Sequence, residues 1–146
     1  KTLELIQKSK IKNHNYQVRL RDHFVSGLKR TIPEVKINGP EDPRNRVSHI
    51  VSATFPGIEN EQLLLQLDKH GVRASAGSAC ASRDIEPSHV LRAVGLSKAE
   101  ARSSIRFSFS KYTTKAELDY VLKILPKVVK KIQGLYPEEL RKKYYI

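Results

Sequence analysis

The segment Ser104–Phe109 constrains the fold of this chain more than any other, because its polarity alternates without a break. Its odd-numbered residues are Ile105, Phe107 and Phe109, and its even-numbered residues are polar. Successive side chains of a β-strand point to opposite faces, so this pattern predicts one apolar face and one polar face. A sheet built on such a strand needs a covering layer of helices on its apolar side.

Helical and extended patterns alternate along the rest of the chain. Apolar spacing and end signals predict helices over residues 2–30, 59–69, 87–94, 97–102 and from the capping box 114–117 onward. Short strands are predicted at 35–37, 47–55 and 72–74. Residues 13–15 should fray or break the first helix, and Pro126 should kink the last one. Together these elements indicate an α+β fold: a small, mostly antiparallel sheet with helices packed mainly on one face, preceded by a long N-terminal helix.

The formal net charge of +12 is distributed unevenly. Residues 1–46 hold 11 Lys and Arg against 5 Asp and Glu, and residues 111–146 hold 9 against 4. The middle of the chain, residues 47–110, is nearly neutral with 7 against 6. A basic surplus at the two ends suits a solvated or partner-facing surface better than a nucleic-acid groove.

Three further features of composition limit the classes of protein to consider. A single cysteine cannot form an internal disulfide, so an oxidising compartment is not implied. No apolar run approaches the roughly 18 residues that span a bilayer, and the basic start lacks the apolar core of a signal peptide. The chain starts with Lys1 and contains no methionine, so we expect an upstream part that is absent from this sequence.

The only cysteine, Cys80, lies in the run of small residues 74–82. No side chain in this run is large enough to shield a thiol, and glycine and serine favour loop conformations. A structural cysteine usually lies among large aliphatic residues, so the pattern predicts an accessible thiol on a loop. The alternative is an incidental cysteine in a loop, and composition alone does not separate the two readings.

Two other side chains are candidates for chemistry. Arg106 lies on the polar face of its strand between two serines; it either faces solvent or binds a carboxylate through its paired N–H groups. His89 could assist the thiol by folding back, although its position favours the helix that follows the loop. His14 and His23 have no cysteine or carboxylate at ligand spacing, which argues against a metal site.

The segments 77–80, 86–91 and 104–108 resemble the C-terminal domain of cysteine desulfurases, the pyridoxal-phosphate enzymes of the aminotransferase class V group. The resemblance extends in order from about Leu20 to Lys131 and includes residues 55–57. It implies that Cys80 accepts the sulfur of L-cysteine as a persulfide while alanine is released. It also implies that Arg106 binds the carboxylate of the substrate. The loop between Cys80 and Pro87 is similar to the longer-loop branch, which passes sulfur to scaffold or other acceptor proteins for iron–sulfur cluster assembly.

The resemblance implies a domain organisation and a set of partners as well. Residues 1–30 would link to an absent cofactor domain, 31–133 would form the small domain with the catalytic loop, and 134–146 a polar tail. The family's Schiff-base lysine, with its adjacent histidine, lies in the preceding domain, and no such motif occurs here. The isolated chain is therefore expected to bind no pyridoxal phosphate and to be inactive. Ala76 replaces a serine that is common in the family's loop.

The complete enzyme is expected to be a homodimer in the cytoplasm, or in the mitochondrial matrix of a eukaryote. No membrane, nucleic acid or resident metal is expected, and Cys80 would contact an iron–sulfur cluster only transiently. Two other classes of function stay open from the residues alone. One is a basic module that binds nucleic acid or an acidic protein, with an incidental cysteine. The other is a thiol redox sensor that uses Cys80 alone.

Overall fold

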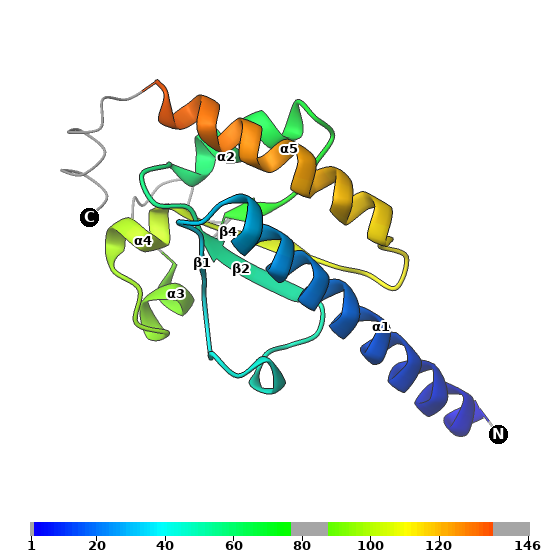
Figure 1. The fold of residues 1–146 in the computed structure, drawn as a ribbon. Helices are drawn as coiled ribbons and strands as arrows, with labels where there is room; N and C mark the ends of the chain where they lie inside the picture. Colours follow the sequence, from blue (N-terminus) through cyan, green and yellow to red (C-terminus); the bar gives the residue numbers. More distant parts are fainter. Residues whose placement is uncertain (1, 77–87, 136–146) are drawn as a thin grey trace.

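The computed structural model describes residues 2–76 and 88–135, with backbone only for residues 2–12. In chain order the elements are α1 (Thr2–Thr31), β1 (Lys36–Ile37), a 3-10 helix (Pro43–Asn45), β2 (Ile50–Thr54), α2 (Asn60–Asp68), β3 (Ser75–Ala76), α3 (His89–Ala93), α4 (Lys98–Arg102), β4 (Ser104–Ser108) and α5 (Lys115–Gln133). Figure 1 shows α1, α2 and α5 grouped together over the sheet, with α3 and α4 set apart from them.

The four strands form one antiparallel sheet in the order β1-β2-β4-β3. The predicted α+β class, the small antiparallel sheet and the long N-terminal helix are confirmed. Strand β4 lies inside the sheet, and each of its neighbours is far from it in sequence. The sheet therefore forms only when the chain closes long loops, and local propensity cannot set its register.

The core lies between the apolar face of the sheet and the helices α1, α2 and α5. Ile105, Phe107 and Phe109 are buried there, as their alternation predicts. Phe24 of α1 is fully buried and meets both phenylalanines edge to face, with ring centroids 5.0 Å from Phe107 and 5.6 Å from Phe109. Burying aromatic surface from two elements in one cluster ties α1 firmly to the sheet.

Helices α1 and α5 lie side by side and run in the same direction (Figure 1). The hydroxyl of Tyr16 donates to the carbonyl oxygen of Thr113, and further along His23 meets Asp119. Gly27 allows the closest approach, because a Cβ at that position would overlap the side chain of Leu122. A glycine inside a helix lowers its intrinsic stability, and here the close packing of the two helices offsets that loss.

Several predicted ends and caps are confirmed. The predicted capping box Thr114–Glu117 opens α5 with both reciprocal hydrogen bonds. A second box, Ser97–Glu100, opens α4 in the same way and was not predicted. Gly71 and Gly95 follow α2 and α3 with φ of 72° and 91°, the left-handed conformation that favours glycine. Helix α5 continues through Pro126. Among the described helices, none is both long and apolar enough to cross a bilayer.

The predicted break in the first helix is wrong, because α1 continues through residues 13–15. Asparagine and histidine reduce helix propensity by only a fraction of a kcal/mol per residue, roughly 0.7 at most. Tyr16 immediately follows this segment and is held by its bond to Thr113. The tertiary contact therefore outweighs the weak local preference.

The strand predicted at 72–74 lies instead at Ser75–Ala76. The backbone N–H of Val72 donates to the carbonyl oxygen of Leu67, and Gly71 donates to Asp68. These bonds hold Val72 in the C-terminal turn of α2, so the chain joins β4 only further on. The strand predicted at 47–55 is also shorter, since the described ladder begins at Ile50.

Ser104 lies on the same face of β4 as Arg106, as the alternation predicts, but unlike Arg106 it is only 1% exposed. Its hydroxyl donates to the carbonyl oxygen of Glu100 at 2.7 Å and lies 2.7 Å from the hydroxyl of Thr54. The last turn of α4 covers this end of the polar face. Hydrogen bonding satisfies the buried hydroxyl, which is what allows a serine to be buried there.

Candidate functional site

Arg106 occupies the centre of β4 and is exposed on the polar face of the sheet. In the strand register it lies opposite Ser52 of β2 and opposite Ser75 of β3. Both neighbours are small, so neither side chain crowds the arginine. The hydrogen-bonded ladders on both sides of β4 hold its backbone in place, and the guanidinium is thus presented from a rigid element.

The guanidinium of Arg106 has no hydrogen bond and no ion pair with any residue that the structure describes. It therefore keeps its five N–H donors for a ligand. The fork geometry of arginine matches a carboxylate through two parallel hydrogen bonds. A small carboxylate could therefore bind to Arg106 at the sheet surface, between the two serine neighbours.

The same face carries a polar network beside the Arg106 row. The side-chain amide of Asn38 lies 3.0 Å from the hydroxyl of Ser52, 3.2 Å from that of Ser104 and 2.8 Å from that of Thr54. The network joins β1, β2 and β4 side by side. Its buried members are hydrogen-bonded to one another, so the polar side chains at this end of the face are held in place.

Cys80 lies outside the described residues, and so does Pro87. The strand that leads into their segment is β3, and it pairs directly with β4 through Ser75 and Arg106. The structure therefore brings the entrance of the Cys80 segment next to Arg106. The sequence predicted Arg106 from alternation and Cys80 from loop composition, each on its own. The pairing of β3 with β4 shows that the residues leading toward Cys80 lie next to Arg106.

The histidines are placed differently from one another. His89 is exposed at the first position of α3, in the helix that its sequence favours. The Nε2 of His23 lies 2.5 Å from the Oδ1 of Asp119 on α5, and Lys115 pairs with the same carboxylate at 2.8 Å. Within the described ranges, no group of His, Cys, Asp and Glu could hold a metal ion.

Carboxylates on the described surface serve local structure. The N–H of Ser97 donates to Glu100 and Lys36 pairs with it, and these interactions lower the pKa of Glu100 to about 2. The pKa of Glu117 is lowered mainly by the backbone N–H of Thr114. Both carboxylates are charged at neutral pH and are already engaged, so neither is a candidate general base in this site.

One buried charge was missed by the sequence analysis. Arg21 of α1 is only 4% exposed; it donates to the carbonyl oxygen of Arg46 at 3.1 Å and pairs with Asp22 at 2.8 Å. It ties α1 to the segment before β2. Its spacing gave no signal, because a charged residue on a long polar helix is normally solvated.

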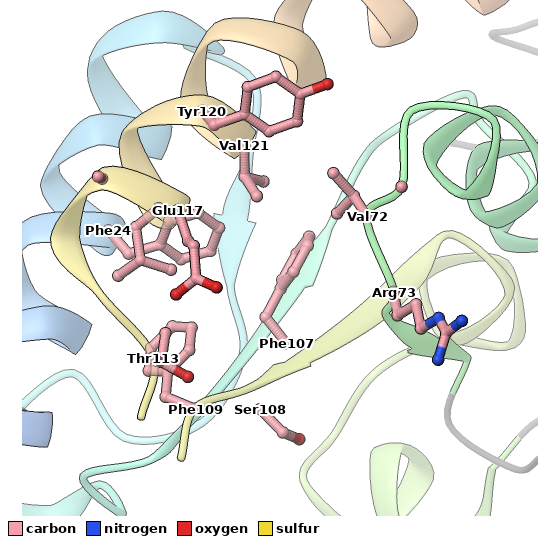
Figure 2. A pocket seen from close by; sticks show the side chains of 13 residues that line it. Phe24, Val72, Arg73, Phe107, Ser108, Phe109, Thr113, Glu117, Tyr120 and Val121 are labelled. Atoms are coloured by element: carbon pink, nitrogen blue, oxygen red, sulfur yellow. The ribbon is translucent and has the colours of Figure 1, made fainter. Parts of the chain in front are cut away.

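One cavity among the described residues is a groove of about 470 Å³ between α5 and the segment before β3 (Figure 2). Phe24, Phe107 and Phe109 are among its apolar lining residues, and Glu117 and Arg73 line it as charged residues from opposite sides. Another cavity, about 170 Å³, lies between α1 and the segment before β2. Neither is lined by a lysine. A pyridoxal-phosphate cofactor needs a lysine for its Schiff base, so neither cavity fits it.

Comparison with known proteins gives the family. Residues 1–121 match the model of the aminotransferase class V family. The chain belongs to this family. It is 41% identical over 137 residues to a protein of Clostridium botulinum (strain Hall) named cysteine desulfurase IscS, and 43% identical over 127 residues to cysteine desulfurase 2 of Trichormus variabilis. These alignments cover 94% and 87% of the class V chain described here, but only 34% and 31% of the relatives.

Solved structures agree with these relatives. A NifS-like protein superposes with a TM-score of 0.71 at 26% identity, covering 88% of this chain and 31% of its own. A NifS-like protein from Rickettsia africae gives a TM-score of 0.66 at 25% identity, covering 82% and 29%. The chain thus spans about a third of the length of the class V proteins that it matches.

Proposed function

We propose that this chain is the part of a cysteine desulfurase that accepts sulfur, with Cys80 as the sulfur carrier and Arg106 as the carboxylate-binding residue. The observation that carries the proposal is the setting of Arg106. It is exposed, it has no partner among the described residues, and it lies in register with the strand that enters the Cys80 segment. The cysteine desulfurase relatives support the same reaction class.

The chain length between the two residues suits this division of roles. Cys80 follows Ala76 by four residues, and a stretch of that length spans at most about 14 Å. Ala76 pairs with Ile105, the neighbour of Arg106. A substrate of the size of cysteine, held by its carboxylate at Arg106, therefore falls within reach of the thiol.

The proposed reaction balances without an external oxidant. The Cys80 thiolate attacks the sulfur of L-cysteine, an S–S bond forms, and the C–S bond of the substrate breaks. The carbon that loses sulfur gains a proton, so alanine leaves and Cys80 carries a persulfide. A thiolate is a strong nucleophile toward sulfur, whereas a serine hydroxyl is scarcely ionised at neutral pH.

The proposed reaction also needs a cofactor and a sulfur acceptor that this chain does not supply. Pyridoxal phosphate would provide the electron sink for C–S cleavage, held by residues outside the two cavities described above. The persulfide would then pass to an acceptor protein for iron–sulfur cluster assembly or another sulfur transfer. A run of small residues around Cys80 suits a thiol that must meet two partners in turn.

The decisive experiment uses the complete gene product that carries this chain. After one turnover with L-cysteine, mass spectrometry should find one extra sulfur on the peptide that contains Cys80. The Cys80→Ser variant should retain its melting temperature and release no alanine, since no large side chain surrounds the thiol in sequence. Alanine formed at the normal rate by this variant, or the extra sulfur on another cysteine, would refute the assignment.

A further inference from the structure

Exposed cations follow the line along which α1 and α5 meet. The two helices run in parallel, as three contacts show. Tyr16 of α1 meets Thr113 just before α5, His23 meets Asp119 between the helices, and Glu34 just after α1 meets Gln133 at 3.4 Å. The partner numbers advance together along both helices. A residue on α1 therefore lies near the α5 residue about 96 to 99 positions later.

The His23–Asp119 contact identifies the two helix faces that share this surface. Residues three, four or seven positions apart lie on the same face of a helix. Lys123 is four residues after Asp119, and Lys127 and Lys130 continue that side of α5. Arg30 is seven residues after His23 and continues the matching side of α1. Arg30, Lys123, Lys127 and Lys130 are all exposed, and we call them the basic patch.

The basic patch is not neutralised within the described part of the chain. None of its four cations forms an ion pair or hydrogen bond there. Asp119 and Glu34 lie on the same line, on either side of the patch, and both have other partners: Asp119 pairs with Lys115, and Glu34 accepts from Gln133. Four uncompensated like charges on one surface repel one another, and this repulsion is present in the folded chain. An anionic partner would reduce it.

We propose that the basic patch docks the acidic surface of another protein. Lys123 and Lys130 are seven residues apart, which corresponds to about 10 Å along a helix. Such a short patch, bounded by carboxylates at both ends, matches a discrete acidic cluster. A nucleic-acid duplex carries a charge about every 1.7 Å without interruption, so its backbone would run against Asp119 or Glu34. The patch also contains no aromatic residue on which a base could stack.

The proposal is independent of the sulfur chemistry. It uses neither Cys80 nor Arg106, and it stands whether or not the complete protein releases alanine. The charge distribution along the sequence points in the same direction, since the basic surplus belongs to the two ends of the chain, which contribute α1 and α5.

The test compares two triple variants of the complete gene product with the same change in net charge. The patch variant carries Lys123→Gln, Lys127→Gln and Lys130→Gln. The control carries Lys69→Gln, Arg73→Gln and Lys111→Gln, three exposed cations outside the patch. Affinity is measured for a peptide of alternating glutamate and serine and for a short DNA duplex, at two salt concentrations. Circular dichroism checks that both variants fold.

We expect the patch variant to bind the acidic peptide about tenfold more weakly and the control to change little, since each exposed pair contributes modestly. The difference should shrink as salt is raised. Equal losses in both variants would show that only net charge matters and would overturn the proposal. Tighter binding of DNA than of peptide, lost in the patch variant alone, would identify a nucleic-acid surface and overturn it as well.

Discussion

Two arginines of this chain have opposite relations to the fold. Arg21 is buried, and its guanidinium pairs with Asp22 and donates to the carbonyl oxygens of Arg46 and Val47. Arg106 is exposed and, within the described residues, makes no such bond. Residue type alone does not distinguish them. The number of donors left for a ligand does, and on that ground we propose that Arg106 binds substrate and that Arg21 is structural.

This contrast yields a matched pair of substitutions in the complete gene product. Arg106→Ala should raise the Michaelis constant for L-cysteine about ten- to a hundredfold, because a charge-assisted pair contributes roughly 1.5–3 kcal/mol, and should leave the melting temperature unchanged. Arg21→Ala should do the reverse and lower the free energy of unfolding by about 1–3 kcal/mol, as buried acceptors lose their donors. Steady-state kinetics and thermal unfolding of both variants check this. A normal Michaelis constant with a lowered melting temperature would make Arg106 structural.

At the scale of elements, the carboxylate of Glu100 connects α4 to β1. It caps α4 through the N–H of Ser97 and pairs with Lys36 at 3.0 Å. Its folded-state pKa is about 2, well below the ordinary value of 4.5. A lowered pKa means that the charged form stabilises the fold. That contribution is fully present above about pH 4.5 and is lost as the pH falls toward 2.

The variant Glu100→Gln tests this contribution, because glutamine can still accept at the cap but has no charge and does not titrate. We expect the native protein to be more stable than the variant at pH 6 by a measurable margin in urea unfolding, and the margin to shrink toward pH 2. Asp42, Glu117 and Asp119 also have lowered pKa values, and they remain in both proteins. A margin that stays constant over this pH range would contradict the assignment.

At the scale of the whole molecule, the close approach of α1 and α5 holds the helical layer together. Gly27→Val should destabilise the fold by about 1–3 kcal/mol, since the new side chain must displace the buried Leu122. Leu122→Ala leaves a cavity by itself, but it should relieve part of the cost in the double variant. Thermal unfolding of the two single variants and the double variant measures this coupling. Additive losses would show that the two residues do not compete for space.

A further expectation at this scale concerns the cofactor. The chain of residues 1–146 alone should bind no pyridoxal phosphate and release no alanine from cysteine, because the Schiff-base lysine motif that the family resemblance implies does not occur in this sequence. Absorbance of the Schiff base, followed by borohydride reduction and peptide mapping, checks this once circular dichroism shows that the chain is folded. A stable adduct on one lysine of this chain would place the cofactor here after all.

Local rules were sufficient where one segment determines its own structure. The alternation at Ser104–Phe109 predicts the buried face of β4, and the capping box Thr114–Glu117 predicts where α5 begins. Gly71 and Gly95 end their helices because only a residue without a Cβ adopts a positive φ at little cost. Alternation also gives the face on which Arg106 lies, although not its exposure, since Ser104 on the same face is buried.

The tertiary structure decided the features that depend on partners distant in sequence. Ser104 is buried because the last turn of α4 covers it, and β3 begins late because the end of α2 holds Val72. The meeting of His23 with Asp119 joins residues 96 positions apart, which no local spacing can indicate. The same holds for the pairing of β3 with β4, which places Ser75, five residues before Cys80 in sequence, beside Arg106. The sequence by itself determined which faces are apolar and where several helices begin or end, because those preferences act within a few residues. Which faces meet, and where the short strands pair, was decided only by packing, because its free energy comes from contacts across the whole chain.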